Sequence, residues 1–279
     1  MISYQKYFAV CSLALLTQAA FAQSAPSLGS ASNFAVLSAA PNGGGAVTCT
    51  DSTMIGDVGS SGERASVVQT RCTISGAIIA PVSAGVLSDF NNAYDALAAT
   101  RCDQVLTGTL AGVTLSPGVY CFDAAATLTG TLTLQGSSNG TWLFKVGTVG
   151  TGALTGTNFS VVMAGGGQAC NVTWWVAEAA TMTTSNFLGT IFAGAAITDT
   201  GGTFNGNALA KAAVTLTGAS LAGCESSGRS NPPRQRCNQG VGNGPENCDP
   251  GNSNQGNPFR SNDETGGVPG KPGRQGGNK

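Results

Sequence analysis

A short phrase, Thr-x-Thr, recurs through the second half of this chain and constrains its fold more than any other feature. It occurs at 127–129, 181–183, 198–200 and 215–217, and the last three copies begin 17 residues apart. In an extended strand, residues i and i+2 point to the same side, so each phrase places two threonines on one face. Stacked at a fixed period, the phrases give a regular grid of small hydroxyl and methyl groups. Such a grid is better suited to binding a repetitive surface than to catalysing a reaction.

A corner signal and a large apolar residue follow each phrase. Aligned on the second threonine, the units read Thr155-Gly-Thr-Asn158-Phe159, Thr183-Thr-Ser-Asn186-Phe187, Thr200-Gly-Gly-Thr203-Phe204 and Thr217-Gly-Ala-Ser220-Leu221. In this alignment Ala153 replaces the first threonine of its unit, and Asp199 points inward where other units have Leu or Met. Glycine adopts the backbone angles of a corner at little cost, and the apolar residue begins the next strand. Strand, corner, strand is the pattern of a β-solenoid coil.

The charge balance excludes several classes of function. The chain has 13 Lys and Arg against 14 Asp and Glu, and it has no His. A nucleic-acid binder needs a basic field, and Ser/His/Asp, Cys/His and most zinc sites need His. A β-helix enzyme that cleaves polysaccharide needs converging carboxylates, whereas the carboxylates here are scattered. We therefore expect no catalytic residue, no metal and no cofactor.

The N-terminus predicts export. Lys6 is the only charge before an apolar run over residues 8–16, and Ala20-Phe21-Ala22 forms a small-x-small cleavage pattern. This is typical of a signal peptide, so we assign residues 1–22 to it and expect a secreted, extracellular chain from Gln23. The apolar run is too short to span a membrane comfortably, and we expect no membrane insertion.

Cysteine usage agrees with export. Besides Cys11 in the signal region, the chain has an even number of cysteines: Cys49, Cys72, Cys102, Cys121, Cys170, Cys224, Cys237 and Cys248. An even number in a secreted chain is typical of disulfides, although sequence does not determine which cysteines pair. Our working expectation is pairing in sequence order: 49–72, 102–121, 170–224 and 237–248.

Two segments depart from the repeat. From Pro81 to Thr100, apolar residues recur every three or four positions, which predicts one amphipathic helix docked on the solenoid. Residues 226–279 are rich in Gly, Asn and Pro and poor in large apolar residues, which predicts a flexible tail. The acidic and Asn-rich stretch 246–252 lacks the spaced carboxylates of a calcium loop. Residues 23–225 are thus the expected folded domain.

Several motifs, in order, resemble one known family. They are Leu28-Gly-Ser-Ala-Ser-Asn-Phe-Ala-Val-Leu37, Gly56-Asp-Val-Gly59, Leu115-Ser-Pro-Gly-Val-Tyr120, Leu128-Thr-Gly-Thr-Leu-Thr-Leu134, Ala169-Cys-Asn-Val-Thr-Trp174 and Asn205-Gly-Asn-Ala-Leu-Ala-Lys-Ala-Ala-Val-Thr-Leu216. Together they resemble the secreted microbial ice-binding (antifreeze) protein family over about residues 27–224. The resemblance implies a mainly β fold: a right-handed parallel β-helix of irregular coils with one long α-helix alongside, and N-terminal strands packed beside C-terminal ones.

The resemblance also implies a function and a site. Members contact ice through a flat Thr-rich face, often with a Thr-(Ala/Gly)-x-(Thr/Asn) motif, which two units here match fully. The expected partner is therefore the ice surface, bound by a monomer without any reaction. The expected ice-binding residues are Thr127, Thr129, Thr155, Asn158, Thr181, Thr183, Asn186, Thr198, Thr200, Thr203, Thr215, Thr217 and Ser220.

One alternative function stays open. A surface adhesin or structural matrix protein could have the same fold, because Thr is common on exposed β-strands. Such a protein would bind cells or glycans without using the threonine grid, and the aromatic pair Trp174-Trp175 could then serve as its contact.

Overall fold

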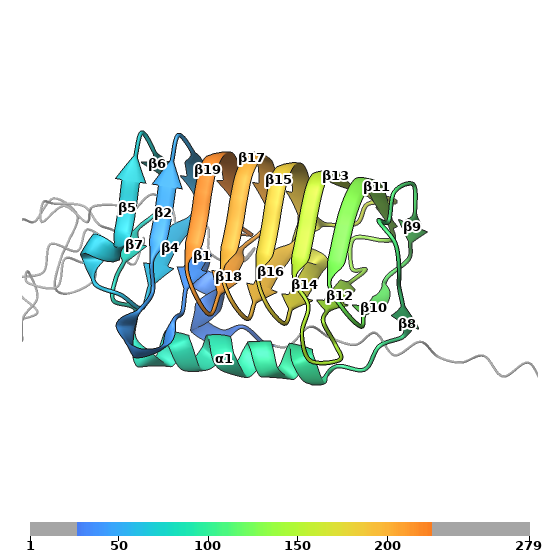
Figure 1. Ribbon diagram of the computed structural model, residues 1–279, viewed down its shortest axis with the longest axis horizontal. Helices are drawn as coiled ribbons and strands as arrows, with labels where there is room; N and C mark the ends of the chain where they lie inside the picture. Colours follow the sequence, from blue (N-terminus) through green and yellow to red (C-terminus); the bar gives the residue numbers. More distant parts are fainter. Residues whose placement is uncertain (1–26, 225–279) are drawn as a thin grey trace, which may run out of the picture. The chain divides into compact units, whose positions relative to one another are not determined.

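The computed structural model describes residues 27–224 as a parallel β-helix. Each regular coil has a strand in one sheet, a turn, and then a long strand that bends at a corner of the second sheet (Figure 1). Every strand pair is parallel, and the coils of β13, β15, β17 and β19 stack in register. The expected fold class is confirmed.

Two sheets form the walls. Sheet A contains, in spatial order, β7 (Ile78–Ile79), β4 (Asp57–Ser60), β1 (Phe34–Ser38), β18 (Ala208–Ala210), β16 (Thr190–Ala193), β14 (Val172–Val176), β12 (Trp142–Val146), β10 (Gly118–Phe122) and β8 (Gln104–Val105). Sheet B contains β5 (Val67–Thr70), β2 (Val47–Thr50), β19 (Val214–Ala222), β17 (Ile197–Asn205), β15 (Ala180–Leu188), β13 (Leu154–Ala164), β11 (Ala126–Gln135) and β9 (Thr114–Leu115). Two short strands, β3 (Thr53–Ile55) and β6 (Thr73–Ile74), continue the coils of β2 and β5 after the corner.

The spatial order of the coils differs from their order in the chain. β1 lies between β4 and β18, and β19 lies between β17 and β2 (Figure 1). The first coils of the chain therefore dock on the last coil, as the resemblance implied. The chain enters β1 through the 3-10 helix η1 (Gly29–Asn33), and three further 3-10 turns lie between strands: η2 (Pro41–Gly43), η3 (Arg64–Ser66) and η4 (Ala169–Asn171).

The interior is filled by inward-facing apolar side chains, among which aromatic rings form a continuous ladder. Phe144 stacks on Trp174 with ring centroids 4.0 Å apart, and Phe187 lies 5.1 Å from Trp174 and 5.1 Å from Phe204. Trp174 and Phe187 belong to one coil, and Phe144 and Phe204 belong to the coils on either side of it, so the ladder ties three neighbouring coils together through the core.

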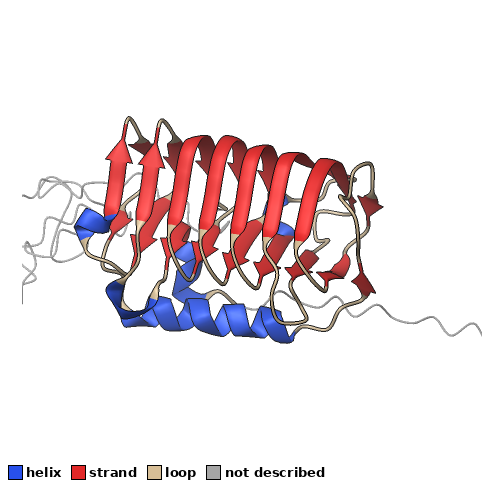
Figure 2. Ribbon diagram, viewed as in Figure 1, coloured by secondary structure: helices blue, strands red, loops and turns tan. Residues whose placement is uncertain are grey.

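One helix covers the outside of sheet A (Figure 2). Helix α1 (Ala84–Ala99) begins after Ser83, whose hydroxyl accepts a hydrogen bond from Val86 N. The expected helix is confirmed, with its ends a few residues inside the predicted range of 81–100. At its C-terminus, the buried ammonium of Lys145 donates to the carbonyls of Ala98 (2.7 Å) and Thr100 (2.6 Å). This charge complements the negative end of the helix dipole.

Three disulfides join the coils, in the sequential pattern that we expected. They are Cys49–Cys72, Cys102–Cys121 and Cys170–Cys224. The signal peptide expected over 1–22, the tail expected over 226–279 and the pair Cys237–Cys248 lie outside the described residues. Within residues 27–224, no helix combines the length and apolarity needed to cross a membrane.

Candidate functional site

The outward side chains of sheet B before its corner form two parallel rows of threonine, which we call the threonine face. The first row is Thr127, Thr155, Thr181, Thr198, Thr215 and Thr48, and Val68 ends it. The second row is Thr157, Thr183, Thr200, Thr217, Thr50 and Thr70. Thr129 lies at the position of a register shift between β11 and β13. The strands that carry the rows form the front wall in Figure 1, and helix α1 runs along a different side.

The hydroxyls of this face are available to an external partner. In residues 27–224 the threonine side chains that hydrogen-bond to protein groups are Thr100, Thr148, Thr184 and Thr203, none of which belongs to the two rows. The threonines of the face are all exposed or half-buried. Beneath them, the alternate residues of the same strands are buried in the core, which holds the rows in place.

The structure corrects the alignment of one coil. Thr155 pairs with Thr181, and Thr157 pairs with Thr183. Thr155 is therefore the first threonine of its pair, not the second, and Ala153 replaces nothing. The error arose because Thr-Gly-Thr-Asn imitates the corner motif two residues too early, whereas the corner of this coil begins at Asn158, whose φ is 48°.

Four threonines of the face were missed from the sequence: Thr48, Thr50, Thr70 and Thr157. A signal for two of them existed, because Thr48-Cys-Thr50 is itself a Thr-x-Thr phrase. It lies far from the other copies along the chain, and only the docking of β2 on β19 places it in the grid.

The polar residues that follow the corner lie on a different face. Asn186, Thr203 and Ser220 pair in register as one row of the adjoining face, which continues to Thr53. This row is partly self-satisfied, since Thr203 Oγ1 donates to Asn186 Oδ1 at 2.9 Å and Asn186 Nδ2 donates to Ser160 Oγ at 3.4 Å. The expected site residues thus divide into free hydroxyls before the corner and groups beyond it that are partly bonded to one another.

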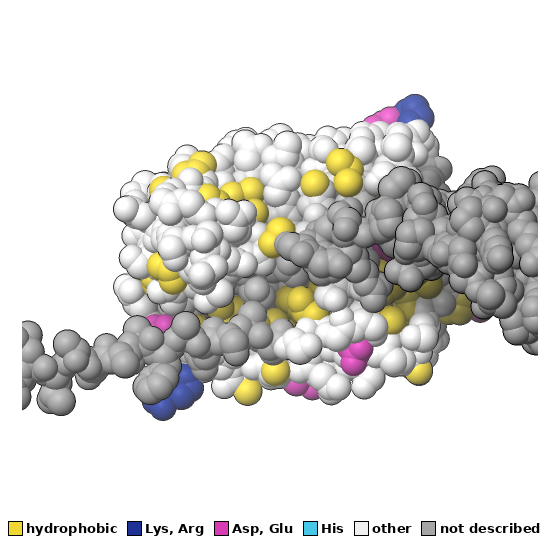
Figure 3. Space-filling view, turned by 180° about the vertical axis from the view of Figure 1, so that it is seen from behind, with side chains coloured by type: hydrophobic (Ala, Val, Ile, Leu, Met, Phe, Trp, Pro, Cys, Tyr) yellow, Lys and Arg dark blue, Asp and Glu magenta, His cyan; other side chains and the backbone are white. Residues whose placement is uncertain are grey.

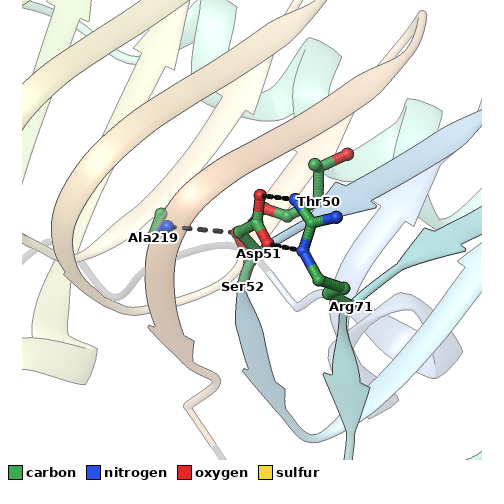
Figure 4. A network of polar contacts seen from close by, with 5 residues as sticks. All are labelled: Thr50, Asp51, Ser52, Arg71 and Ala219. Atoms are coloured by element: carbon green, nitrogen blue, oxygen red, sulfur yellow. Dashed lines mark hydrogen bonds and ion pairs between the residues drawn. The ribbon is translucent and has the colours of Figure 1, made fainter.

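Buried serine side chains hold the corner itself. Ser52 Oγ donates to Thr50 O (2.7 Å) and accepts from Ala219 N (3.1 Å) in the next coil, as Figure 4 shows. Ser185 repeats this arrangement, donating to Thr183 O and accepting from Phe159 N at 3.2 Å. These bonds satisfy backbone N–H groups that the bend removes from the sheet ladder.

One inward residue of the threonine face is a carboxylate. Asp199 lies between Met182 and Leu216 in the inner row, as its sequence position predicted, and its side chain is 2% exposed. Burial raises the pKa of Asp199 to about 7. Its Oδ2 has no hydrogen-bond partner within the described chain.

The structure offers little to an enzyme or to an aromatic adhesion site. Residues 27–224 contain no cluster of three or more potential metal ligands. On the part of the opposite side that Figure 3 leaves uncovered, charged side chains are few, and they are scattered except for one adjoining acidic and basic pair at the upper right. Trp174 and Trp175 are both buried, in the core and beneath the helix respectively, so the exposed aromatic pair that the adhesin alternative invoked is absent from this region.

Known proteins share this architecture. A curated relative from Nostoc sp. (strain HG1), described as an ice-binding protein, is 36% identical over 200 residues, covering 70% of this chain and 72% of its own. The crystal structure of an ice-binding protein from an Antarctic biological consortium matches with a TM-score of 0.63 and 32% identity, over 72% of this chain and 92% of that one. The ice-binding protein of the Antarctic ascomycete Antarctomyces psychrotrophicus matches with a TM-score of 0.63 and 31% identity, over 71% and 98%.

The family assignment follows from the extent of the match. The model of the ice-binding-like family matches residues 42–222, which include every strand of the threonine face. The chain belongs to the ice-binding-like family.

Proposed function

We propose that this protein binds ice through its threonine face and so inhibits ice growth and recrystallisation, without catalysing a reaction. One observation carries the proposal: two register-locked rows of threonine whose hydroxyls have no hydrogen-bond partner within residues 27–224, on the side of the β-helix that helix α1 leaves open. The relatives described above are ice-binding proteins, and their likeness to this chain supports the same activity here.

The geometry of the rows suits an ordered water layer. Adjacent strands lie about 4.7–4.9 Å apart, and same-side residues along a strand lie about 6.6–6.8 Å apart. These repeats are comparable to oxygen spacings on crystal planes of ice. Methyl groups shape the water between the rows while hydroxyls anchor it, and each ordered water costs little entropy to hold.

The rigidity of the face contributes as well. Threonine is β-branched and has few χ1 rotamers, so little side-chain freedom remains to be lost on binding. The inner residues of the same strands, such as Met182 and Leu216, are fully buried and hold the outer rows in place. The proposed contacts are the two rows and Thr129, with Asn158, Asn186, Thr203 and Ser220 flanking them at and beyond the corner.

We further propose that the protein is secreted and acts as a monomer. The three disulfides within residues 27–224 support an oxidising compartment. Sedimentation of the purified chain at working concentration tests the monomer; a stable dimer would contradict it.

The test compares bulky substitutions on and off the face, using freezing hysteresis and ice recrystallisation inhibition of the full chain. Thr183→Tyr and Thr200→Tyr place a large ring among the central threonines, so we expect most of the activity to disappear. Thr48→Tyr should reduce it as well, because β2 extends the same rows. Asn91→Tyr, on the exposed side of helix α1, is the matched control and should leave activity unchanged.

All four side chains face solvent or are only half-buried, so their effects on the free energy of unfolding should stay within about 0.5 kcal/mol. An active parent whose activity survives Thr183→Tyr and Thr200→Tyr would move the site elsewhere. An inactive parent that binds cells or glycans would replace ice binding with the adhesin function.

A further inference from the structure

The corner that ends the threonine face has an apex residue with a positive φ in every coil. The first residue after the second threonine row always has a positive φ: Asn158, Thr184, Gly201, Gly218, Asp51 and Arg71, with Gly130 in the shorter corner of β11. Glycine adopts this conformation freely, whereas a β-branched residue such as Thr184, at φ 46°, resists it. Strain of this kind persists where the surrounding structure, and often function, requires it.

The non-glycine apexes occur only as bonded partners in adjacent coils. Thr184 Oγ1 donates to Asn158 Oδ1 at 2.6 Å, which joins β15 to β13. Arg71 forms a two-pronged ion pair with Asp51, which joins β5 to β2 (Figure 4). The apex positions of β17 and β19 are glycines and can form no such bond. The strained residues therefore lie at the corners where a side-chain hydrogen bond or ion pair links two adjacent coils.

The Thr184–Asn158 bond lies at the junction where the regular 17-residue repeat of the face begins. β15, β17 and β19 follow one another at 17-residue intervals, whereas the first threonines of β13 and β15, Thr155 and Thr181, are 26 residues apart. The ladder between β13 and β15 is also interrupted at this corner, between the pairs Thr157–Thr183 and Ser160–Asn186. Past the corner β13 and β15 share only the pair Ser160–Asn186, whereas β15 and β17 pair from Ser185–Gly202 to Leu188–Asn205, so the β13–β15 junction has less backbone support.

From these observations we propose that Thr184 and Asn158 form a clamp that fixes the spacing of Thr157 and Thr183 across the β13–β15 junction. They act as positioning residues for the threonine face, and this inference removes Asn158 from the ice contacts proposed above. Their polar groups are directed to each other, while the hydroxyls of the rows that they follow have no partner among the described residues. The inference rests on the proposed function.

Four variants of the full chain test the clamp: Thr184→Gly, Asn158→Gly, the double variant and Thr184→Ser. Glycine relieves the strained φ and removes the bond, so the melting temperature should not fall. Freezing hysteresis should nevertheless fall by about half or more in each glycine variant, because a more mobile face loses more conformational entropy when it binds. Thr184→Ser keeps the hydroxyl and should keep the activity.

The double variant separates a clamp from two independent contacts. If the residues act through their mutual bond, the double variant loses no more activity than either single one. If each touches ice by itself, the losses multiply, and the clamp is wrong. Amide hydrogen exchange at Thr157 and Thr183 provides a readout that needs no ice: we expect faster exchange in the glycine variants and parental exchange in Thr184→Ser.

The outcomes distinguish this inference from the proposed function. An active parent whose glycine variants keep full activity overturns the clamp alone. A parent without freezing hysteresis overturns the proposed function, and the clamp loses its role with it.

Discussion

The outer faces of sheet A and of sheet B are built from the same kind of parallel strands, but one is covered by helix α1 and the other is left open. On sheet A, one outward row consists of Leu37, Leu209, Phe192 and Trp175, all buried beneath helix α1. On the threonine face, the outward rows are short hydroxylated residues that no element of the described chain covers. The comparison teaches that outward residues decide whether a face of a solenoid binds the chain's own helix or is left for an external surface.

The largest expected effect is a loss of stability when the contact between sheet A and helix α1 is disrupted. Phe192 is 2% exposed, and its ring lies 6.0 Å from that of Phe90 on the helix. Phe192→Ala removes this contact and leaves a cavity, so the free energy of unfolding should fall by about 3–5 kcal/mol. Thermal or denaturant unfolding measures it.

The same variant sharpens the contrast between the faces. Phe192→Ala should keep its freezing hysteresis at low temperature as long as it is folded, whereas Thr200→Tyr should lose activity and keep its stability. Loss of both properties in either variant would mean that the two faces are not independent.

The next effect concerns the carboxyl group under the open face. Since burial raises the pKa of Asp199 to about 7, the unfolded chain releases this proton at lower pH than the folded one. The contribution of Asp199 to stability is therefore favourable at low pH and declines as the pH rises from about 4 to about 7. The decline amounts to as much as about 4 kcal/mol before it levels off.

Asp199→Leu gives this coil the residue found at Leu216 in the next one. We expect it to remove that pH dependence and to raise stability at pH 8, as followed by denaturant unfolding between pH 4 and pH 8. A parent whose stability does not change between these pH values would show that Asp199 is ionised in the folded state at little cost.

The smallest effect extends the open face by one position. Val68 ends the first row in β5 and is 49% exposed. Val68→Thr is nearly isosteric and adds a hydroxyl in register with Thr48, so we expect a small gain in freezing hysteresis and a change of less than about 0.5 kcal/mol in stability. A large loss would indicate that the methyl groups at this edge matter more than the hydroxyls.

The sequence predicted much of the fold and part of the face. The Thr-x-Thr phrases and the apolar residues after each corner were enough to predict the solenoid, and the spacing of Val86, Phe90 and Leu97 was enough to predict the helix. Each of these signals lies within a few consecutive residues, where the period of a strand or helix can be read directly.

The missed parts depend on contacts between distant segments. Thr48 and Thr50 join the grid only because β2 docks on a strand more than 160 residues later, which no local pattern reveals. Thr184 occupies a corner apex where glycine was the expected residue, and the reason becomes visible only in its bond to Asn158. The two-residue misalignment at Thr155 has the same origin, because pairing between coils and not the motif determines the register.

The position of β19 between β17 and β2 determines how the face can be assembled. Among the strands of the threonine face, synthesis delivers β2 and β5 first and β19 last. Until residues 214–222 exist, the early coils have no neighbour to pair with on that side, and the later coils end at an open edge. The lattice of threonines therefore cannot grow one coil at a time from the N-terminus, because β2 lacks its neighbour on that side until β19 has been synthesised. A chain truncated before Val214 would carry two shorter patches instead of one continuous surface.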